Sequence, residues 1–122
     1  MAGVGGGVYG GLAAASGAGT GEIDQTLSAG SLGTVNPPGF DQSIGTLVWT
    51  PGSGGSTVSG LTAGSAGQLL TILNPTTAAN DLTLDIAAGG STQFQGSGNF
   101  VLSPGQSVRA VYLASNSSWN IA

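Results

Sequence analysis

From residue 46 onward, apolar and polar residues alternate in short segments, and turn-forming residues interrupt the pattern about every ten residues. The clearest segment is DLTLDI at 81–86, in which Leu82, Leu84 and Ile86 share one face. Because side chains alternate between the two faces of a β-strand, this pattern predicts a strand with one buried face. Short strands at this spacing predict an all-β fold: an antiparallel β-sandwich, a jelly roll or a small barrel.

The alternation and the turn residues together place eight strands, at 46–50, 57–61, 68–73, 81–86, 92–95, 99–102, 107–113 and 118–121. In the turn 103–106, Pro104 and Gly105 occupy the two central positions, which predicts a type II turn. The predicted core consists of the apolar residues on the inward faces: Leu69 or Leu70, Ile72, Leu82, Leu84, Ile86, Phe94, Phe100, Leu102, Val108, Tyr112, Trp119 and Ile121.

The N-terminal part of the chain has a different composition. Residues 1–21 contain nine glycines and no charged side chain, and the stretch up to residue 45 mixes turn residues with isolated apolar ones. We therefore expect two regions: an extended Gly-rich N-terminal arm with loops at 1–45 and a β-sandwich domain at 46–122. If this division is right, a chain without residues 1–40 keeps its fold.

Within the predicted arm, Tyr9 is an isolated aromatic in a glycine-rich stretch. Buried aromatic anchors contribute strongly to protein interfaces, so we expect Tyr9, with Val8 and Leu12, to bind a partner. The alternative is that Tyr9 packs back onto its own domain.

The composition excludes most chemistry. The chain has no His, Cys or Lys, which removes the usual general base, thiolate nucleophile, His/Cys metal ligands and Schiff-base amine. We expect a protein that is not an enzyme and that uses no cofactor or metal. Arg109 is the only Lys or Arg and the net charge is −4. Phosphate and anionic-lipid surfaces need several cations, so neither a nucleic acid nor a membrane is expected as a partner.

Two acids, Asp81 and Asp85, lie close together in the predicted domain. Four residues along one strand separate them by roughly 13 Å, which exceeds the spacing of the paired carboxylates that hydrolyse glycosidic bonds. A solvated strand face is the preferred interpretation, with a weak cation site as the alternative. Arg109 is expected to pair with one of these acids or with an acid of another subunit.

The predicted core is thin for a domain of this size. Gly, Ala, Ser and Thr make up 66 of the 122 residues, and these side chains bury little area. Burial between subunits would compensate, so we expect a homo-oligomer, with a marginally stable monomer as the alternative. The candidate interface residues are Trp49, Arg109 and Trp119; either tryptophan could instead lie in the core or stack on a sugar.

Over 58–121 the sequence resembles a recurrent module of bacteriophage structural proteins, found in capsid decoration proteins and in the heads of tail fibres or spikes. The resemblance rests on short motifs in a fixed order: Ser59-Gly60-Leu61, 67–74 (GQLLTILN), Leu82-Thr83-Leu84, Phe94, 102–107 (LSPGQS), Val111-Tyr112 and Ser118-Trp119. It implies a jelly-roll-like β-sandwich that trimerises, serves virion architecture and carries no catalytic residues.

The resemblance covers capsid and tail proteins alike, and chain length favours the capsid. Only about 45 residues precede the module. We therefore expect a capsid decoration (cement) protein on the virion surface, a trimer that staples neighbouring subunits of the major capsid protein. The alternative is a tail fibre or spike tip that binds a host receptor or glycan. A hydrolase subunit is disfavoured by the absence of His, Cys and Lys.

Overall fold

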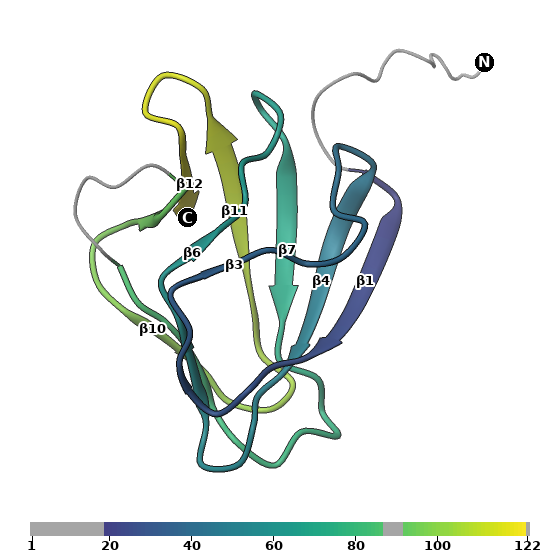
Figure 1. Ribbon diagram of the computed structural model, residues 1–122, viewed down its shortest axis with the longest axis vertical. Helices are drawn as coiled ribbons and strands as arrows, with labels where there is room; N and C mark the ends of the chain where they lie inside the picture. The colour runs from purple at the N-terminus through teal and green to yellow at the C-terminus, as the bar shows by residue number, and fades with distance from the viewer. Residues whose placement is uncertain (1–18, 87–91, 122) are drawn as a thin grey trace.

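A computed structural model describes residues 19–86 and 92–121, and all helix or strand structure in these ranges is β-strand (Figure 1). The strands are β1 (Gly21–Thr26), β2 (Gly30–Ser31), β3 (Thr34–Val35), β4 (Ile44–Thr50), β5 (Ser56–Val58), β6 (Gly60–Leu61), β7 (Leu69–Leu73), β8 (Leu82–Leu84), β9 (Phe94–Gln95), β10 (Phe100–Leu102), β11 (Ser107–Leu113) and β12 (Ser118–Ile121). Across these ranges no helix is long and apolar enough to cross a bilayer.

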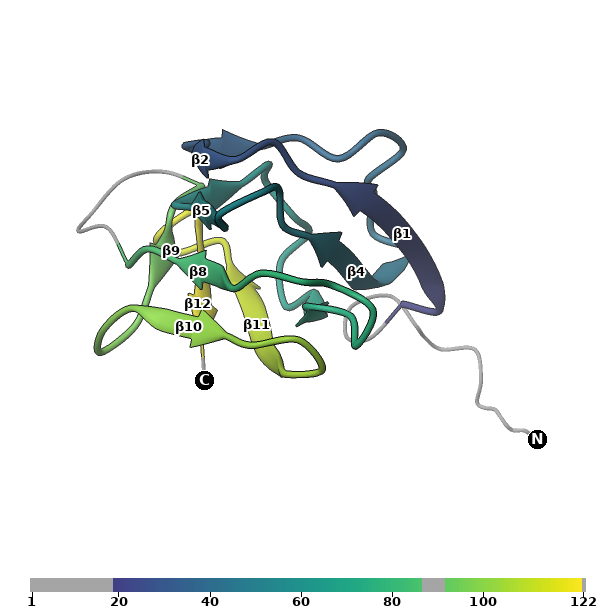
Figure 2. The ribbon, with the colours of Figure 1, turned by 90° about the horizontal axis from the view of Figure 1, so that it is seen from below.

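The strands form two facing sheets and a short pair. The six-stranded sheet has the order β1-β4-β7-β11-β12-β9, and the four-stranded sheet has the order β10-β8-β5-β2. The remaining pair is β3-β6. Figure 2 shows the four-stranded sheet beside the long strands of the six-stranded sheet. The predicted all-β sandwich is thus confirmed in its general form.

The first eight strands stack in a solenoid-like manner. The chain runs through β1, β2 and β3, then through β4, β5 and β6, and then through β7 and β8. Each strand lies parallel to its counterpart in the preceding passage, as in β1-β4-β7 and β2-β5-β8. The repeat is 26 residues on the four-stranded sheet, where Ser31 pairs with Thr57 and Thr57 pairs with Thr83.

The predicted antiparallel, jelly-roll-like arrangement is wrong for most of the sheet structure. Of the nine strand pairings among the described residues, six are parallel. The physical reason is that the turns carry the chain to another sheet rather than back along the same one. After β4, for example, Gly54 and Gly55 adopt φ values of 83° and 102°, which favour glycine, and the chain enters the four-stranded sheet as β5.

The predicted arm differs most from the structure. Residues 21–45 contribute three strands, and β1 pairs with β4 along its whole length. Leu27, Val35 and Ile44 are buried members of the core. The isolated apolar residues of this stretch therefore complete the sandwich, and in the described part of the chain the folded domain begins well before residue 46. Residues 1–18 lie outside the described residues.

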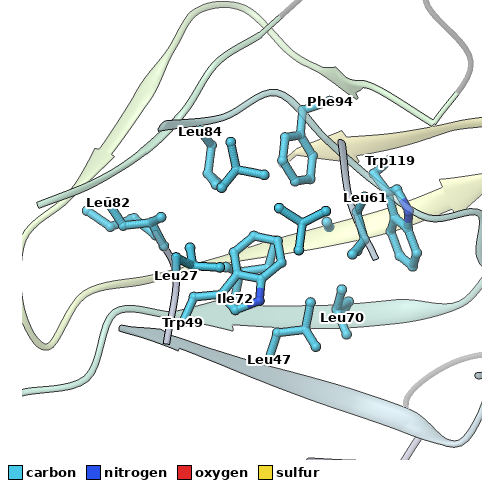
Figure 3. Close-up of a cluster of buried hydrophobic side chains, with 14 of the residues drawn as sticks. Leu27, Leu47, Trp49, Leu61, Leu70, Ile72, Leu82, Leu84, Phe94 and Trp119 are labelled. Atoms are coloured by element: carbon cyan, nitrogen blue, oxygen red, sulfur yellow. The ribbon is translucent and has the colours of Figure 1, made fainter. Parts of the chain in front are cut away.

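The core lies between the two sheets, and Figure 3 shows side chains from both projecting into it. Of the predicted core, the buried members are Leu70, Ile72, Leu82, Leu84, Phe94, Leu102, Tyr112 and Trp119. Ile86, Phe100, Val108 and Ile121 are half-buried and pack against the core, whereas Leu69 faces outward. Several further buried residues come from the first two passages of the solenoid: Leu27, Val35, Ile44, Leu47, Trp49, Val58 and Leu61.

The predicted strand positions agree well with those observed from β4 onward. Residues 107–113 and 118–121 form β11 and β12 with the predicted bounds. The predicted strand at 57–61 is divided into β5 and β6, because the chain changes sheets at Ser59. The type II turn is consistent with a φ of 91° at Gly105 and a 2.9 Å hydrogen bond from the Gln106 amide to the Ser103 carbonyl.

Candidate functional site: a hydroxyl-lined groove

A row of side chains crosses the outer face of the four-stranded sheet. Ser31 on β2, Thr57 on β5, Thr83 on β8 and Val101 on β10 are direct cross-strand neighbours. Their flanking residues Val58, Leu82, Leu84 and Leu102 are buried, so alternation directs the row outward. Three hydroxyls therefore follow one another at about the spacing of adjacent strands, roughly 4.8 Å.

This row lies in a groove of about 350 Å³. Its lining residues come from all four strands and from the adjoining turns: Gly30, Ser31, Gly54, Gly55, Ser56, Thr57, Asp81, Thr83 and Val101. The exposed Asp81 immediately precedes β8 and adds a carboxylate to the hydroxyls. Val101 is 56% exposed and adds an apolar surface next to Thr83. The groove thus combines neutral donors and acceptors, one anionic acceptor and one apolar contact.

The turn beside the groove is held by a buried serine. The Ser56 hydroxyl donates to the Ser28 carbonyl at 2.6 Å and accepts from the Gly52 amide at 2.9 Å. A Cβ at Gly54 would meet no heavy atom within 4 Å, so this part of the wall is open backbone. Ser56 therefore fixes the geometry of the wall, whereas the exposed Ser31 and the half-buried Thr57 and Thr83 are on the outer face.

A second hollow, of about 320 Å³, lies between the loop after β6 and the loop before β4, with Asp41, Gln42, Ala63, Gly64, Ser65 and Gln68 as its lining. Its polar groups are largely committed to the backbone. The side-chain amide of Gln68 donates through Nε2 to the backbone carbonyls of Asp41 and Ile44, and its Oε1 accepts from the backbone amide of Ser65. The hydroxyl and backbone amide of Ser43 donate to Asp41 and lower the pKa of its carboxyl. We therefore regard the groove as the better candidate.

The predicted interface residues Trp49, Arg109 and Trp119 differ in their exposure to solvent. Trp49 and Trp119 are fully buried, which corresponds to the core position that was the alternative to an interface or to stacking on a sugar. Alternation turns both inward: the Trp49 indole donates to the Gln25 side chain at 3.1 Å, and the Trp119 indole donates to the Thr62 carbonyl at 2.9 Å. Arg109 is exposed on β11. Val8, Tyr9 and Leu12 lie outside the described residues.

Asp81 and Asp85 flank the two ends of β8, and Asp81 alone of the two lines the groove. Among residues 19–86 and 92–121, no three His, Cys, Asp or Glu side chains gather where they could hold a metal ion. The groove is not predicted from the sequence because Ser31 lies in the segment expected to form the arm. The available signal was the repeat of small hydroxyl residues at an interval of 26 positions, which becomes meaningful once parallel stacking is known.

Comparison with known families identifies the sandwich. Residues 29–120 match the family described as the phage depolymerase C-terminal beta sandwich domain. The chain belongs to this family. The match begins at residue 29, immediately before β2, and includes residues expected to belong to the arm. It therefore agrees with a folded region that starts before residue 46. No curated protein and no solved structure matches the chain.

Membership of the phage depolymerase C-terminal sandwich family supports the predicted resemblance to a phage β-sandwich module. It supports a bacteriophage structural domain, and it favours the tail fibre alternative over the capsid decoration protein.

Proposed function

We propose that this chain is a binding module of a phage tail fibre or tailspike that holds a saccharide of the host surface in the hydroxyl-lined groove. The observation that carries the proposal is the row Ser31–Thr57–Thr83 beside Asp81, on a domain whose family is named for phage depolymerases. A depolymerase acts on a polymer, and a C-terminal module that binds the same kind of polymer would keep the virion on it.

The groove has the chemistry that a saccharide requires. Serine and threonine hydroxyls both donate and accept, as sugar hydroxyls do, and a carboxylate accepts from two donors at once. The exposed Val101 offers an apolar surface to the C–H face of a sugar ring. Glycoside hydrolysis uses a pair of carboxylates, and Asp81 is the one carboxylate among the lining residues of the groove. We therefore propose that the module binds rather than cleaves. No cofactor is required by this function.

The capsid decoration function has lost its main support. It rested on a short extended arm before the domain, whereas residues 21–45 belong to the sheets. Labelling the protein within intact virions tests the choice directly: we expect the label at the tail, and a label on the head would contradict the proposal.

Binding itself is tested by substitution in the groove. We expect the chain to bind at least one polysaccharide on an array of bacterial surface glycans, and Thr57→Val, Thr83→Val and Asp81→Asn to weaken that binding about tenfold or more. The two threonine changes keep the size of the side chain and leave a polar group of the sugar without its partner. Asp81→Asn also keeps the size, removes the negative charge and replaces one acceptor oxygen with a donor. Calorimetric titration with the glycan found on the array measures the loss.

Thr26→Val is the matched control, because Thr26 is an exposed threonine on β1 of the other sheet. It should leave the affinity unchanged. The groove is excluded as the binding site if wild-type affinity persists in both the Thr57 and Thr83 variants, or if Thr26→Val is equally damaging.

A further inference from the structure

The carboxylate in the groove is available to a ligand. Asp81 is exposed, and in the part of the chain that the structure describes its side chain makes no hydrogen bond or ion pair. Its backbone carbonyl accepts from the Ser56 amide at 3.3 Å, which holds the residue beside β5. Other acids have partners: Asp41 accepts two hydrogen bonds from a neighbouring serine, and Glu22 shares a hydrogen bond with Asp24. Asp81 therefore has its acceptor oxygens free.

The wall of the groove beside this carboxylate is bare backbone. A Cβ at Gly55 would lie 3.2 Å from the Asp81 carbonyl oxygen, so the two residues are in close contact through their backbones. Gly30 and Gly54 also line the groove, and a Cβ at either would meet no heavy atom within 4 Å. These glycines leave open space on the side of the groove where Asp81 lies, and a ligand group can occupy it.

The outer face of the four-stranded sheet is negatively charged. Because Leu82 and Leu84 are buried, alternation directs Asp81 and Asp85 to the same outer face as Thr83. The chain has no lysine, and its only arginine is on β11 of the six-stranded sheet. A saccharide in the groove therefore meets a carboxylate in the wall, a second one further along β8, and no basic side chain of this chain.

We propose that the saccharide bound in the groove contains an amino sugar with a free amine and carries no acidic group, and that Asp81 accepts a hydrogen bond from the ammonium. The inference rests on the proposed function, because it names the class of saccharide that the groove selects. Like charges brought together at a binding site disfavour the wrong partner, so Asp81 and Asp85 would exclude saccharides that carry carboxylate or phosphate groups.

The charge of the donor distinguishes an amino sugar from a neutral one. A neutral sugar can bond to the hydroxyls of the row and offer a hydroxyl to Asp81. An ammonium donor makes a shorter hydrogen bond to a carboxylate, and such a bond is roughly twice as strong as one between neutral groups. The preference for the amine is therefore assigned to Asp81, whereas Thr57 and Thr83 contribute affinity for any saccharide that fits the groove.

An array of bacterial surface polysaccharides, printed before and after N-acetylation with acetic anhydride, tests the inference with the full chain. N-acetylation converts each free amine into a neutral amide and leaves the sugar backbone of the polymer intact. We expect amine-bearing polysaccharides to bind about tenfold more tightly before the treatment than after it. Added salt should reduce this difference, because it screens charges at an open groove. Acidic polysaccharides should bind more weakly than neutral ones.

Two substitutions in the groove separate the preference from the affinity. Asp81→Asn should abolish the preference for the untreated form, whereas Thr57→Val should weaken binding to both forms and keep the preference. Asp24→Asn is the matched control, because Asp24 is exposed on β1 of the other sheet and the change removes the same charge. It should leave the preference unchanged, and circular dichroism establishes that each variant is folded.

The outcomes distinguish this inference from the proposed function. Equal wild-type binding before and after N-acetylation overturns the inference, and so does tightest binding to an acidic polysaccharide or a preference that persists in Asp81→Asn. In each of these cases the proposed function stands if Thr57→Val still weakens binding. Absence of binding to every polysaccharide on the array overturns both.

Discussion

A chain that lacks residues 1–40 is expected to lose its cooperative fold. The deletion removes β1, β2 and β3, which pair with β4, β5 and β6. It also removes Leu27 and Val35 from the core. Full burial of two such side chains contributes roughly 3–6 kcal/mol, a large share of the 5–15 kcal/mol that stabilises a typical domain. This outcome is the opposite of what an extended arm implies.

The deletion also leaves polar groups without partners. The Trp49 indole loses the Gln25 side chain, and the buried Ser56 hydroxyl loses the Ser28 carbonyl. Far-UV circular dichroism and a thermal melt measure the loss. A chain without residues 1–18 is the comparison, since the effect argued above belongs to residues 19–40. A sharp melting transition in the chain without residues 1–40 would show that the sandwich does not need its first three strands.

Replacement of Asn74 by Asp is expected to destabilise the domain by about 2–6 kcal/mol at neutral pH. Asn74 is fully buried after β7, and its side-chain Nδ2 donates to the carbonyls of Asn80 at 2.9 Å and Leu102 at 2.8 Å. An aspartate would present an oxygen to both carbonyls, and each buried group left unpaired costs about 1–3 kcal/mol. The residue thereby ties the loop before β8 to the end of β10.

The pH dependence distinguishes this cause from a general packing defect. Burial beside two carbonyls raises the pKa of the new carboxyl in the folded state above its unfolded value of about 3.9. The added cost of ionisation is absent below the unfolded pKa and grows as pH rises toward the folded pKa. Urea unfolding of Asn74→Asp should therefore show a defect that increases from acid to neutral pH.

Asn116→Asp is the control for this substitution, because Asn116 is exposed in the turn between β11 and β12. The same chemical change there should cost little at any pH. Equal losses in the two variants, or an Asn74→Asp defect that does not vary with pH, would contradict the role assigned to the Asn74 amide.

Local patterns were sufficient for the second half of the domain. In β8, Leu82 and Leu84 alternate with Thr83, and the period-two pattern identified the strand and its buried face. The turn at 103–106 was similarly predicted from Pro104 and Gly105, because glycine readily adopts the positive φ that a type II turn requires and that Gly105 shows. Both features depend on a few adjacent residues, so they can be read without knowledge of the fold.

The strands of the first half cannot be recognised from the sequence because they are short and their apolar residues are sparse. Leu27 and Val35 stand among turn residues, and nothing local distinguishes them from exposed residues of a loop. They are buried because they complete parallel stacks with strands that lie about 26 residues further along the chain. Trp49 was likewise open to several interpretations until the facing sheet was seen to cover it.

The class of fold and the missing reactive side chains follow from the amino-acid sequence alone. Strand alternation and turn residues act locally, and a chain without His, Cys or Lys lacks those groups in any conformation. The fold itself was needed to see that Ser31, Thr57 and Thr83 form one row, and that Glu22, Thr46, Thr71 and Arg109 form another row on the other sheet. Parallel pairing between distant strands sets both arrangements, and its register is fixed by packing of the whole core rather than by neighbouring residues.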